Sequence, residues 1–232
     1  MRPQRLASAF MRKAVMPLTP ARKRLSMLAW SERYIDRVEE PELRALNRLV
    51  PMGCRTAVDA GANYGLYSMR LASLAHQVHA FEINPEVTAN LQCAELPNVN
   101  LVHTGLSNSK QEVILYIPLL NGTLPLVGWA SLQPGNCPGV DAYKQIPGRV
   151  CPLDDFALAD VDFLKIDVEG HELQVLQGAR ETLVRYRPRI LAEVRDLPGV
   201  MRFLAQFGYQ DKRPEAFGVT GSPDWMHVFC VE

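Results

Sequence analysis

Short apolar runs alternate with segments of helical periodicity through most of the chain. The apolar runs are short and rich in β-branched and aromatic residues, as buried strands are, and they span residues 57–60, 78–82, 99–103, 161–167 and 190–194. The segments between them carry apolar positions three and four apart and predict helices at 66–75, 85–94, 172–184 and 200–207. This alternation predicts an α/β domain with a mostly parallel sheet and helices on both of its faces.

The flanking regions complete the expected domain. Apolar residues recur at helical spacing after Pro41, which predicts a helix over 40–50. Residues 112–117 predict another strand, for which an edge position is one option, and Tyr209 together with 226–231 predicts a final strand pair. The stretch 118–149 is rich in Gly and Pro, so we expect a long irregular loop there, and such loops usually have a function.

Charge is distributed unevenly along a chain whose net charge is zero. The 232 residues contain 25 basic and 25 acidic side chains, yet residues 1–30 contain seven basic residues and no acidic one. We therefore expect a basic, helical N-terminal extension over 1–39 and one domain over 40–232. A basic arm can contact an anionic membrane surface, an RNA or the acidic domain itself, although a solvated terminus is equally consistent with it. Nothing else in the composition indicates specific nucleic-acid binding.

Cysteine usage and hydropathy bear on the compartment. The five cysteines are odd in number and widely spaced, and no C-x-x-C occurs, which argues against a zinc framework and a disulfide scaffold. Residues 113–140 carry no charge, but the prolines and glycines within them exclude a continuous membrane-spanning helix. We expect a cytoplasmic protein, for which peripheral contact at the inner face of a membrane through residues 1–30 is one open alternative.

A glycine turn follows the first predicted strand and indicates a ligand site. It reads Asp59-Ala60-Gly61-Ala62-Asn63-Tyr64-Gly65, at the strand end where doubly wound sheets bind their ligands. Gly61 permits a tight turn and a close approach of the backbone to a ligand, and Gly65 permits close packing of the next helix. The dinucleotide pattern has a second glycine where this chain has Asn63, so a ligand without phosphates fits better.

Two further strand ends extend this site. Glu82 ends the next strand and can accept hydrogen bonds from both hydroxyls of a ribose. Leu106 follows the third strand and can wall an adenine, although a plain core position is an equal alternative. The residues expected to contact a cofactor are Asp59, Gly61, Ala62, Asn63, Gly65, Glu82, Ile83 and Leu106.

These motifs together resemble the FkbM-type methyltransferases over roughly residues 40–210. Besides the glycine turn, the resemblance depends on Phe81-Glu82-Ile83-Asn84-Pro85, Leu153-Asp154-Asp155-Phe156, Ile190-Leu191-Ala192-Glu193-Val194 and, most specifically, Lys165-Ile166-Asp167-Val168-Glu169-Gly170-His171-Glu172. It implies a Rossmann-like class I methyltransferase fold with a seven-stranded sheet. It also implies methyl transfer from S-adenosylmethionine, often to a hydroxyl of a sugar, glycolipid, polyketide or other secondary metabolite.

An alcohol acceptor needs a base within hydrogen-bond reach, and acidic residues follow two adjacent strands. Asp167, Glu169 and His171 follow the strand at 161–166, and Glu193 ends the neighbouring one. We expect one of these four to be the general base, with Asp167 and Glu169 favoured by position and His171 by its intrinsic pKa. A divalent metal held by Asp167, Glu169 and Glu193 is an alternative use of the same carboxylates, although no metal-binding motif requires it.

Two other functions remain open from the sequence. A nicotinamide-dependent oxidoreductase shares the glycine turn and the ribose acid, but Asn63 argues against it. A non-catalytic methyltransferase-like module that binds a partner through its basic arm is the second. The stretch 118–149, with Trp129 and Tyr143, is the candidate lid over a small-molecule or glycan acceptor, or alternatively buries its apolar residues against the sheet or a partner.

Overall fold

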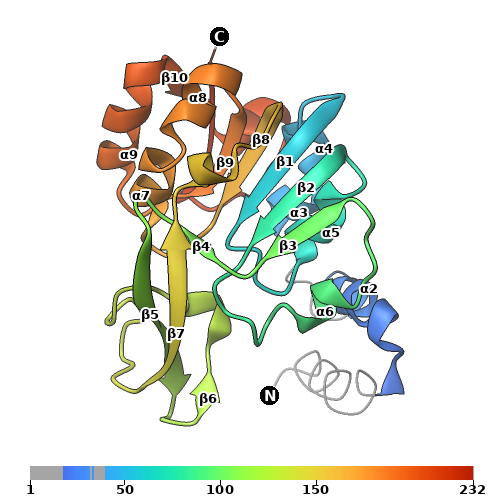
Figure 1. The fold of residues 1–232 in the computed structure, drawn as a ribbon, viewed down its shortest axis with the longest axis vertical. Coiled ribbons are helices and arrows are strands. Elements are labelled where there is room, and N and C mark those ends of the chain that lie inside the picture. Colours follow the sequence, from blue (N-terminus) through green and yellow to red (C-terminus); the bar gives the residue numbers. More distant parts are fainter. Residues whose placement is uncertain (1–17, 32, 34–39, 232) are drawn as a thin grey trace.

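The main sheet has seven strands, as the resemblance to the FkbM-type methyltransferases implies. The computed structural model describes residues 18–31, 33 and 40–231 (Figure 1). The sheet has the order β10-β11-β9-β8-β1-β2-β3. Its strands are β1 Cys54–Ala60, β2 Ala75–Phe81, β3 Val99–Val102, β8 Val161–Ile166, β9 Arg189–Glu193, β10 Tyr209–Asp211 and β11 Met226–Val231. Only the pairings of β11, with β9 and with β10, are antiparallel, so the expected mostly parallel sheet is confirmed.

Strand order reverses beside β1, and this places the ligand-binding edge. The chain runs from β1 outward through β2 and β3, and β8 later pairs on the other side of β1. In the parallel pair of β1 and β8, Asp59 lies opposite Lys165 and Ala60 opposite Ile166. The glycine turn after β1 and the acidic segment after β8 therefore leave the sheet side by side at its switch point.

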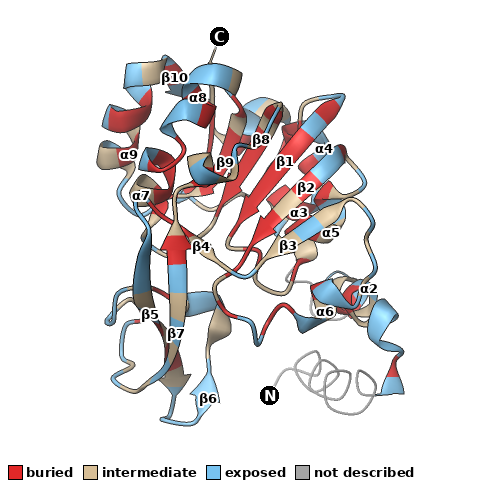
Figure 2. Cartoon of the chain, in the orientation of Figure 1, coloured by how far each residue is buried: buried red, intermediate tan, exposed pale blue. Residues whose placement is uncertain are grey.

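Helices cover both faces of the sheet. They are α2 Ala21–Ser31, α3 Pro41–Arg44, α4 Leu46–Leu49, α5 Leu66–Leu71, α6 Ala89–Gln92, α7 Glu172–Gln177, α8 Arg180–Tyr186 and α9 Leu197–Leu204, with 3-10 turns at Val127–Trp129 (η4), Leu153–Phe156 (η5), Ala205–Phe207 (η6) and Pro214–Phe217 (η7). Neighbouring residues of β1 show the two layers, because Val58 packs with α7, α8 and α9 whereas Ala57 packs with α3, α4 and α5. Figure 2 shows that β1, β8 and β9 are mostly buried between these layers, whereas β3 is mostly of intermediate burial.

Several helices are shorter than the periodicity predicts. The helix expected over 172–184 is two helices, α7 and α8, which meet at Gly178. A Cβ on Gly178 would lie 1.9 Å from the carbonyl oxygen of Ser107, so only glycine fits where this chain crosses the Ser107 turn. The helix expected over 85–94 is reduced to α6, and the one over 40–50 is divided at Ala45 between α3 and α4.

A second, small sheet replaces much of the expected loop over 118–149. It has the order β4-β7-β5-β6, with β4 Gly105–Leu106, β5 Gln111–Leu120, β6 Leu124–Pro125 and β7 Tyr143–Cys151. The strand predicted at 112–117 is confirmed as part of β5, but the irregular loop was wrong for β6 and β7. Pro147 and Gly148 conceal β7 in the sequence. A Cβ on Gly148 would lie 2.5 Å from Cγ1 of Ile83, so the glycine lets this sheet approach the main one.

The described part of the N-terminal extension packs on the domain. Leu25 of α2 is fully buried and shares a core cluster with Ala62, Ala80 and Leu91. Residues 1–17, which carry part of the expected basic arm, lie outside the described residues. Among the described residues, no helix combines the length and apolar character needed to cross a bilayer.

Candidate active site

The turn after β1 is held tightly against both neighbouring strand ends. Gly61 has a φ of +77°, and a Cβ there would lie 1.9 Å from the carbonyl oxygen of Asp167. The N–H groups of Gly61 and Ala62 both donate to the carbonyl of Phe81, each at 3.0 Å. Gly65 has a φ of +89° and faces Leu91 of α6, which a Cβ would approach to 2.7 Å. The turn therefore needs glycine at both positions, and at Gly65 the close neighbour is the side chain of Leu91 in α6.

Glu82 is fixed at the end of β2 by two backbone groups. Its Oε2 accepts from the N–H of Asn63 and its Oε1 from the N–H of Asn84, each at 2.8 Å. Burial raises the pKa of Glu82, and the hydrogen bonds from Asn84 and Asn63 counteract the shift. A buried carboxylate with both oxygens oriented in this way is prepared to accept further hydrogen bonds from a ligand.

A cavity brings most of the expected cofactor residues together with the expected acids. Residues from the strand ends that line it are Gly61, Asn63, Glu82, Ile83, Leu106, Asp167, Glu169 and His171. The small sheet supplies an apolar wall through Leu115 of β5 and Val150 of β7. Asp59, Ala62, Gly65 and Glu193 do not line this cavity. We call it the first cavity.

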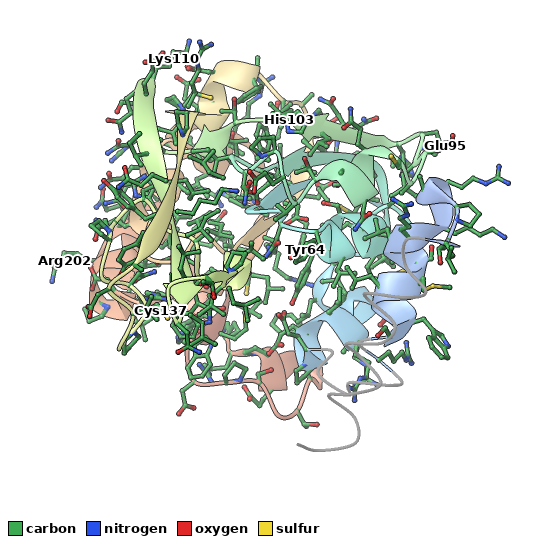
Figure 3. All side chains as sticks on the ribbon, turned by 90° about the horizontal axis from the view of Figure 1, so that it is seen from below. Tyr64, Glu95, His103, Lys110, Cys137 and Arg202 are labelled. Carbon is green, nitrogen blue, oxygen red and sulfur yellow. The ribbon has the colours of Figure 1, made fainter. Side chains whose placement is uncertain are left out.

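A second cavity lies on the other side of the glycine turn. It is lined by Glu40, Leu43, Ala62, Tyr64, Leu66, Tyr67 and Lys165, and it shares Gly61, Asn63, Gly128 and Asp167 with the first cavity. Figure 3, the view from below, shows Tyr64 near the middle of this side, between the small sheet and α2. Of the four expected catalytic residues, Asp167 alone lines both cavities.

The buried side chain of Lys165 connects the carboxyl ends of β1 and β8. Its Nζ lies 3.1 Å from Oδ1 of Asp59 and 3.6 Å from Oδ2 of Asp167, and it donates to the carbonyl of Gly61 at 2.8 Å. Burial lowers the pKa of Lys165, but Asp59 and Asp167 outweigh burial, so the pKa is raised and the ammonium stays charged. Asp59 also accepts from Ser68 Oγ at 2.6 Å and is fully buried. Asp59 therefore anchors the turn and lines neither cavity.

Glu169 is engaged by several groups at once. Its carboxylate forms an ion pair with Arg195, and its carbonyl accepts from Ser131 Oγ and Asn136 Nδ2, each at 2.9 Å. Burial and the nearby Asp167 raise the pKa of Glu169 to about 7, although Arg195 counteracts them. Sequence reasoning missed Arg195 and Asn136. The available signal was the position of Arg195 two residues after Glu193, at a strand end.

The remaining two expected residues differ in position. His171 lines the first cavity, where its Nε2 lies 2.9 Å from Ser107 Oγ, and burial lowers its pKa. The His171 ring therefore points into the first cavity. Glu193 lines neither cavity, and burial, followed by the charges of Asp167 and Glu169, raises its pKa to about 8.

Asp167, Glu169 and Glu193 are the carboxylates that could alternatively bind a divalent metal. Within residues 18–31, 33 and 40–231, no three His, Cys, Asp or Glu side chains are grouped as a metal site would require. The carboxylate of Glu169 is paired with Arg195 instead. The divalent-metal alternative therefore has no support from the described residues.

Comparison with known families identifies the domain. The model of the methyltransferase FkbM domain matches residues 59–210, which contain the glycine turn, Glu82 and the acidic segment. The chain belongs to the FkbM methyltransferase family. A search of curated proteins found no significant match.

One solved structure agrees with the FkbM assignment at the level of fold, and two others are similar at lower scores. The methyltransferase FkbM from Methylobacillus flagellatus KT is 18% identical with a TM-score of 0.53, and the match covers 76% of this chain but 43% of that one. The chain thus spans less than half of that relative. A methyltransferase-like protein from Streptococcus mutans, solved in complex with SAH, is 12% identical with a TM-score of 0.48, the match covering 83% and 98% of the two chains. A TehB-like SAM-dependent methyltransferase from Corynebacterium glutamicum is 13% identical with a TM-score of 0.45, covering 90% and 98%.

Proposed function

We propose that this FkbM-family chain transfers a methyl group from S-adenosylmethionine to a hydroxyl of a sugar, glycolipid or secondary metabolite. The observation that carries the proposal is the position of Asp167, which lies at the junction of two cavities beside the glycine turn. One cavity carries the oriented carboxylate of Glu82 and the other carries Glu40, Tyr67 and Lys165. An adenosyl group and an amino-acid group need two compartments of this kind with a reacting centre between them.

The lining residues fit such a cofactor. Glu82 would hold the ribose hydroxyls, and Ile83 and Leu106 would enclose the adenine. Gly61 offers its backbone at the junction, where the Asp167 carbonyl leaves no space for a side chain. The acidic groups of the second cavity, Glu40 and Asp167, suit an α-ammonium group. When bound, the cofactor supplies a methyl group already activated by its sulfonium.

Asp167 is the group that we place next to the acceptor hydroxyl. Its side chain is 31% exposed and its carboxylate forms an ion pair with the buried ammonium of Lys165. The carboxylate is therefore both oriented and accessible. It would orient the hydroxyl and accept its proton as the oxygen attacks. Glu169 is already paired with Arg195, and Glu193 lies outside both cavities. His171, whose pKa is lowered by burial, is the second candidate base.

Asn63 argues against the alternative that the chain is a nicotinamide-dependent oxidoreductase. This residue adopts a φ of +49°, its N–H is bound to Glu82, and its side chain stands where a pyrophosphate needs glycine. Calorimetric titration with S-adenosylhomocysteine and with NADH separates the two functions. We expect binding of the first alone, and heat from NADH alone would overturn the proposal.

Turnover needs a separate test, because a non-catalytic module also binds the cofactor. Labelled methyl from the cofactor is transferred into a host extract, and mass spectrometry identifies the labelled acceptor and its modified atom. We expect an O-methylated product with the wild type and at least about a hundredfold less with Asp167→Asn, which removes the proton acceptor but keeps the shape. Unchanged transfer by Asp167→Asn would refute the assigned role, and no labelled product with any extract would favour the binding module.

A further inference from the structure

An uncharged segment borders the first cavity beside Glu169, two residues after Asp167, where we place the acceptor hydroxyl. We call residues 127–136 the wall segment. It begins as η4, and its residues Val127, Gly128, Ala130, Ser131 and Leu132 line the cavity. The backbone of Ser131 pairs with Tyr116 of β5 through two hydrogen bonds of 2.8 and 3.0 Å. Beyond Ser131 the segment has no regular strand pairing, so side-chain contacts must fix its remaining part.

Arg195 supplies several of these contacts. It follows β9, and its guanidinium contacts the wall segment at both ends. One nitrogen donates to the side-chain and backbone oxygens of Asn136, the latter at 3.4 Å, and the group lies 5.8 Å from the centre of the Trp129 ring. The other terminal nitrogen forms the ion pair with Glu169. One side chain therefore connects the wall segment to the acidic segment after β8.

The wall segment also contacts the backbone of Glu169. Ser131 and Asn136 both donate to the Glu169 carbonyl. Glu169 has a φ of +54°, a left-handed conformation that glutamate rarely adopts and that persists only where its surroundings impose it. Gly170 follows with a φ of +96°, and its Cα faces Arg195 and Asn136. The conformation just after Asp167 and the placement of the wall segment therefore depend on one another.

We propose that Arg195 is a positioning residue that fixes the wall segment against the segment after Asp167 and thereby shapes the acceptor side of the cavity. The inference rests on the proposed methyl transfer. The contacts of Arg195 involve neither Glu82 nor Gly61, so the expected cofactor side stands apart from them. Arginine suits this position because its planar fork donates to two partners in fixed directions while its face stacks on an aromatic ring.

The test compares Arg195→Met and Arg195→Lys with Arg202→Met as the matched control. Figure 3 shows Arg202 on α9 directed away from the molecule. Chymotrypsin cleavage within the wall segment, followed by mass spectrometry, reports its attachment and needs no substrate. For Arg195→Met we expect cleavage about tenfold faster and an acceptor KM raised about tenfold, with kcat and the Kd for S-adenosylhomocysteine changed by less than about threefold. Arg195→Lys should recover part of both effects, and Arg202→Met should match the wild type.

Several results would overturn the proposal. Wild-type cleavage and acceptor KM in folded Arg195→Met would show that the arginine holds nothing in place. A loss in kcat without a change in acceptor KM would mean that Arg195 acts on the reacting groups instead. If Arg195→Met does not fold, Arg195→Lys decides, because it keeps a cation beside Glu169 but loses the planar fork that reaches Asn136, and the same two effects are expected at smaller size. Absence of S-adenosylhomocysteine binding in the wild type would refute the proposed function, whereas the cleavage comparison would still report on Arg195.

Discussion

Gly61→Ala tests whether the approach of the β1 turn to the β8 end is what forms the site. The added Cβ would start 1.9 Å from the carbonyl oxygen of Asp167 and 3.0 Å from its carbonyl carbon. To reach ordinary contact, the two chain ends must separate by about 1.5 Å, and overpacking of this kind costs about 1–3 kcal/mol. The φ of +77° adds about 1–2 kcal/mol for a residue with a Cβ. We therefore expect a loss of roughly 2–5 kcal/mol in the free energy of unfolding.

Gly53→Ala provides a matched control, because it carries the conformational cost without the clash. Gly53 has a φ of +75°, and nothing lies within 4 Å of a Cβ placed there. We expect this variant to lose only about 1–2 kcal/mol and to bind S-adenosylhomocysteine normally. Gly61→Ala should lower Tm by roughly 5–15 °C and weaken that binding at least about tenfold, since a displacement near 1 Å disturbs a preorganised site.

Calorimetry and thermal unfolding of the two variants and the wild type decide the matter. If Gly61→Ala binds the ligand within about twofold of the wild type while its Tm falls, the turn is structural and does not approach the cofactor. If both variants lose the same stability, the clash with Asp167 is relieved elsewhere and the packing argument is wrong.

Three further predictions follow from the same contacts. Glu82→Gln keeps the shape but loses the charge, so the Kd for S-adenosylhomocysteine should rise about ten- to a hundredfold by calorimetry, and an unchanged Kd would remove Glu82 from the ribose site. Lys165→Met leaves the buried carboxylate of Asp59 without its cation and should cost about 3–5 kcal/mol in urea unfolding, whereas a loss below about 1 kcal/mol would show that the pair is not needed. Burial and nearby acids raise the pKa of Glu193 from 4.5 to about 8, so the folded state binds more protons than the unfolded state between these values and stability falls as pH rises through them. In Tm measurements from pH 5 to 9, Glu193→Gln should flatten this decline, and a slope equal to that of the wild type would contradict the assignment.

The main sheet was predictable because its strands are buried on both faces. Mostly apolar runs such as Val161–Ile166 identify such strands without knowledge of their partners. The small sheet was not, because β7 is mostly exposed and contains Pro147 and Gly148, and its pairing with β5 joins residues that are distant along the chain. The need for glycine at the break was equally inaccessible, since the Ser107 carbonyl that excludes a side chain at Gly178 lies in another segment.

Within the site, the sequence predicted which residues are present better than it predicted which side chains face the cavities. Glu82 and Asp167 follow from their places at strand ends, and the structure places both on the first cavity. Asp59 belongs to the same motif, yet its side chain points into the fold toward Lys165, because β1 alternates its faces. Glu193 ends a neighbouring strand but stops short of both cavities. Arg195 acts through Asn136 and Glu169, whose distance along the chain hides the relation from any local pattern.

The small sheet and the main sheet line different parts of the first cavity, which bears on how the selectivity of the site can change. One part of the first cavity is lined by Leu115, Val150 and residues 127–132, which belong to the β5–β7 region. The hydrogen bonds of this region run mostly within the small sheet, while Glu82 and Gly61 belong to the main sheet. Under the proposed function, substitutions in the β5–β7 region would change the accepted molecule with less effect on the groups that hold the methyl donor. Exchange of residues 111–151 between FkbM relatives would thus be a natural route to new acceptors, provided that the partners of Arg195 are exchanged with them.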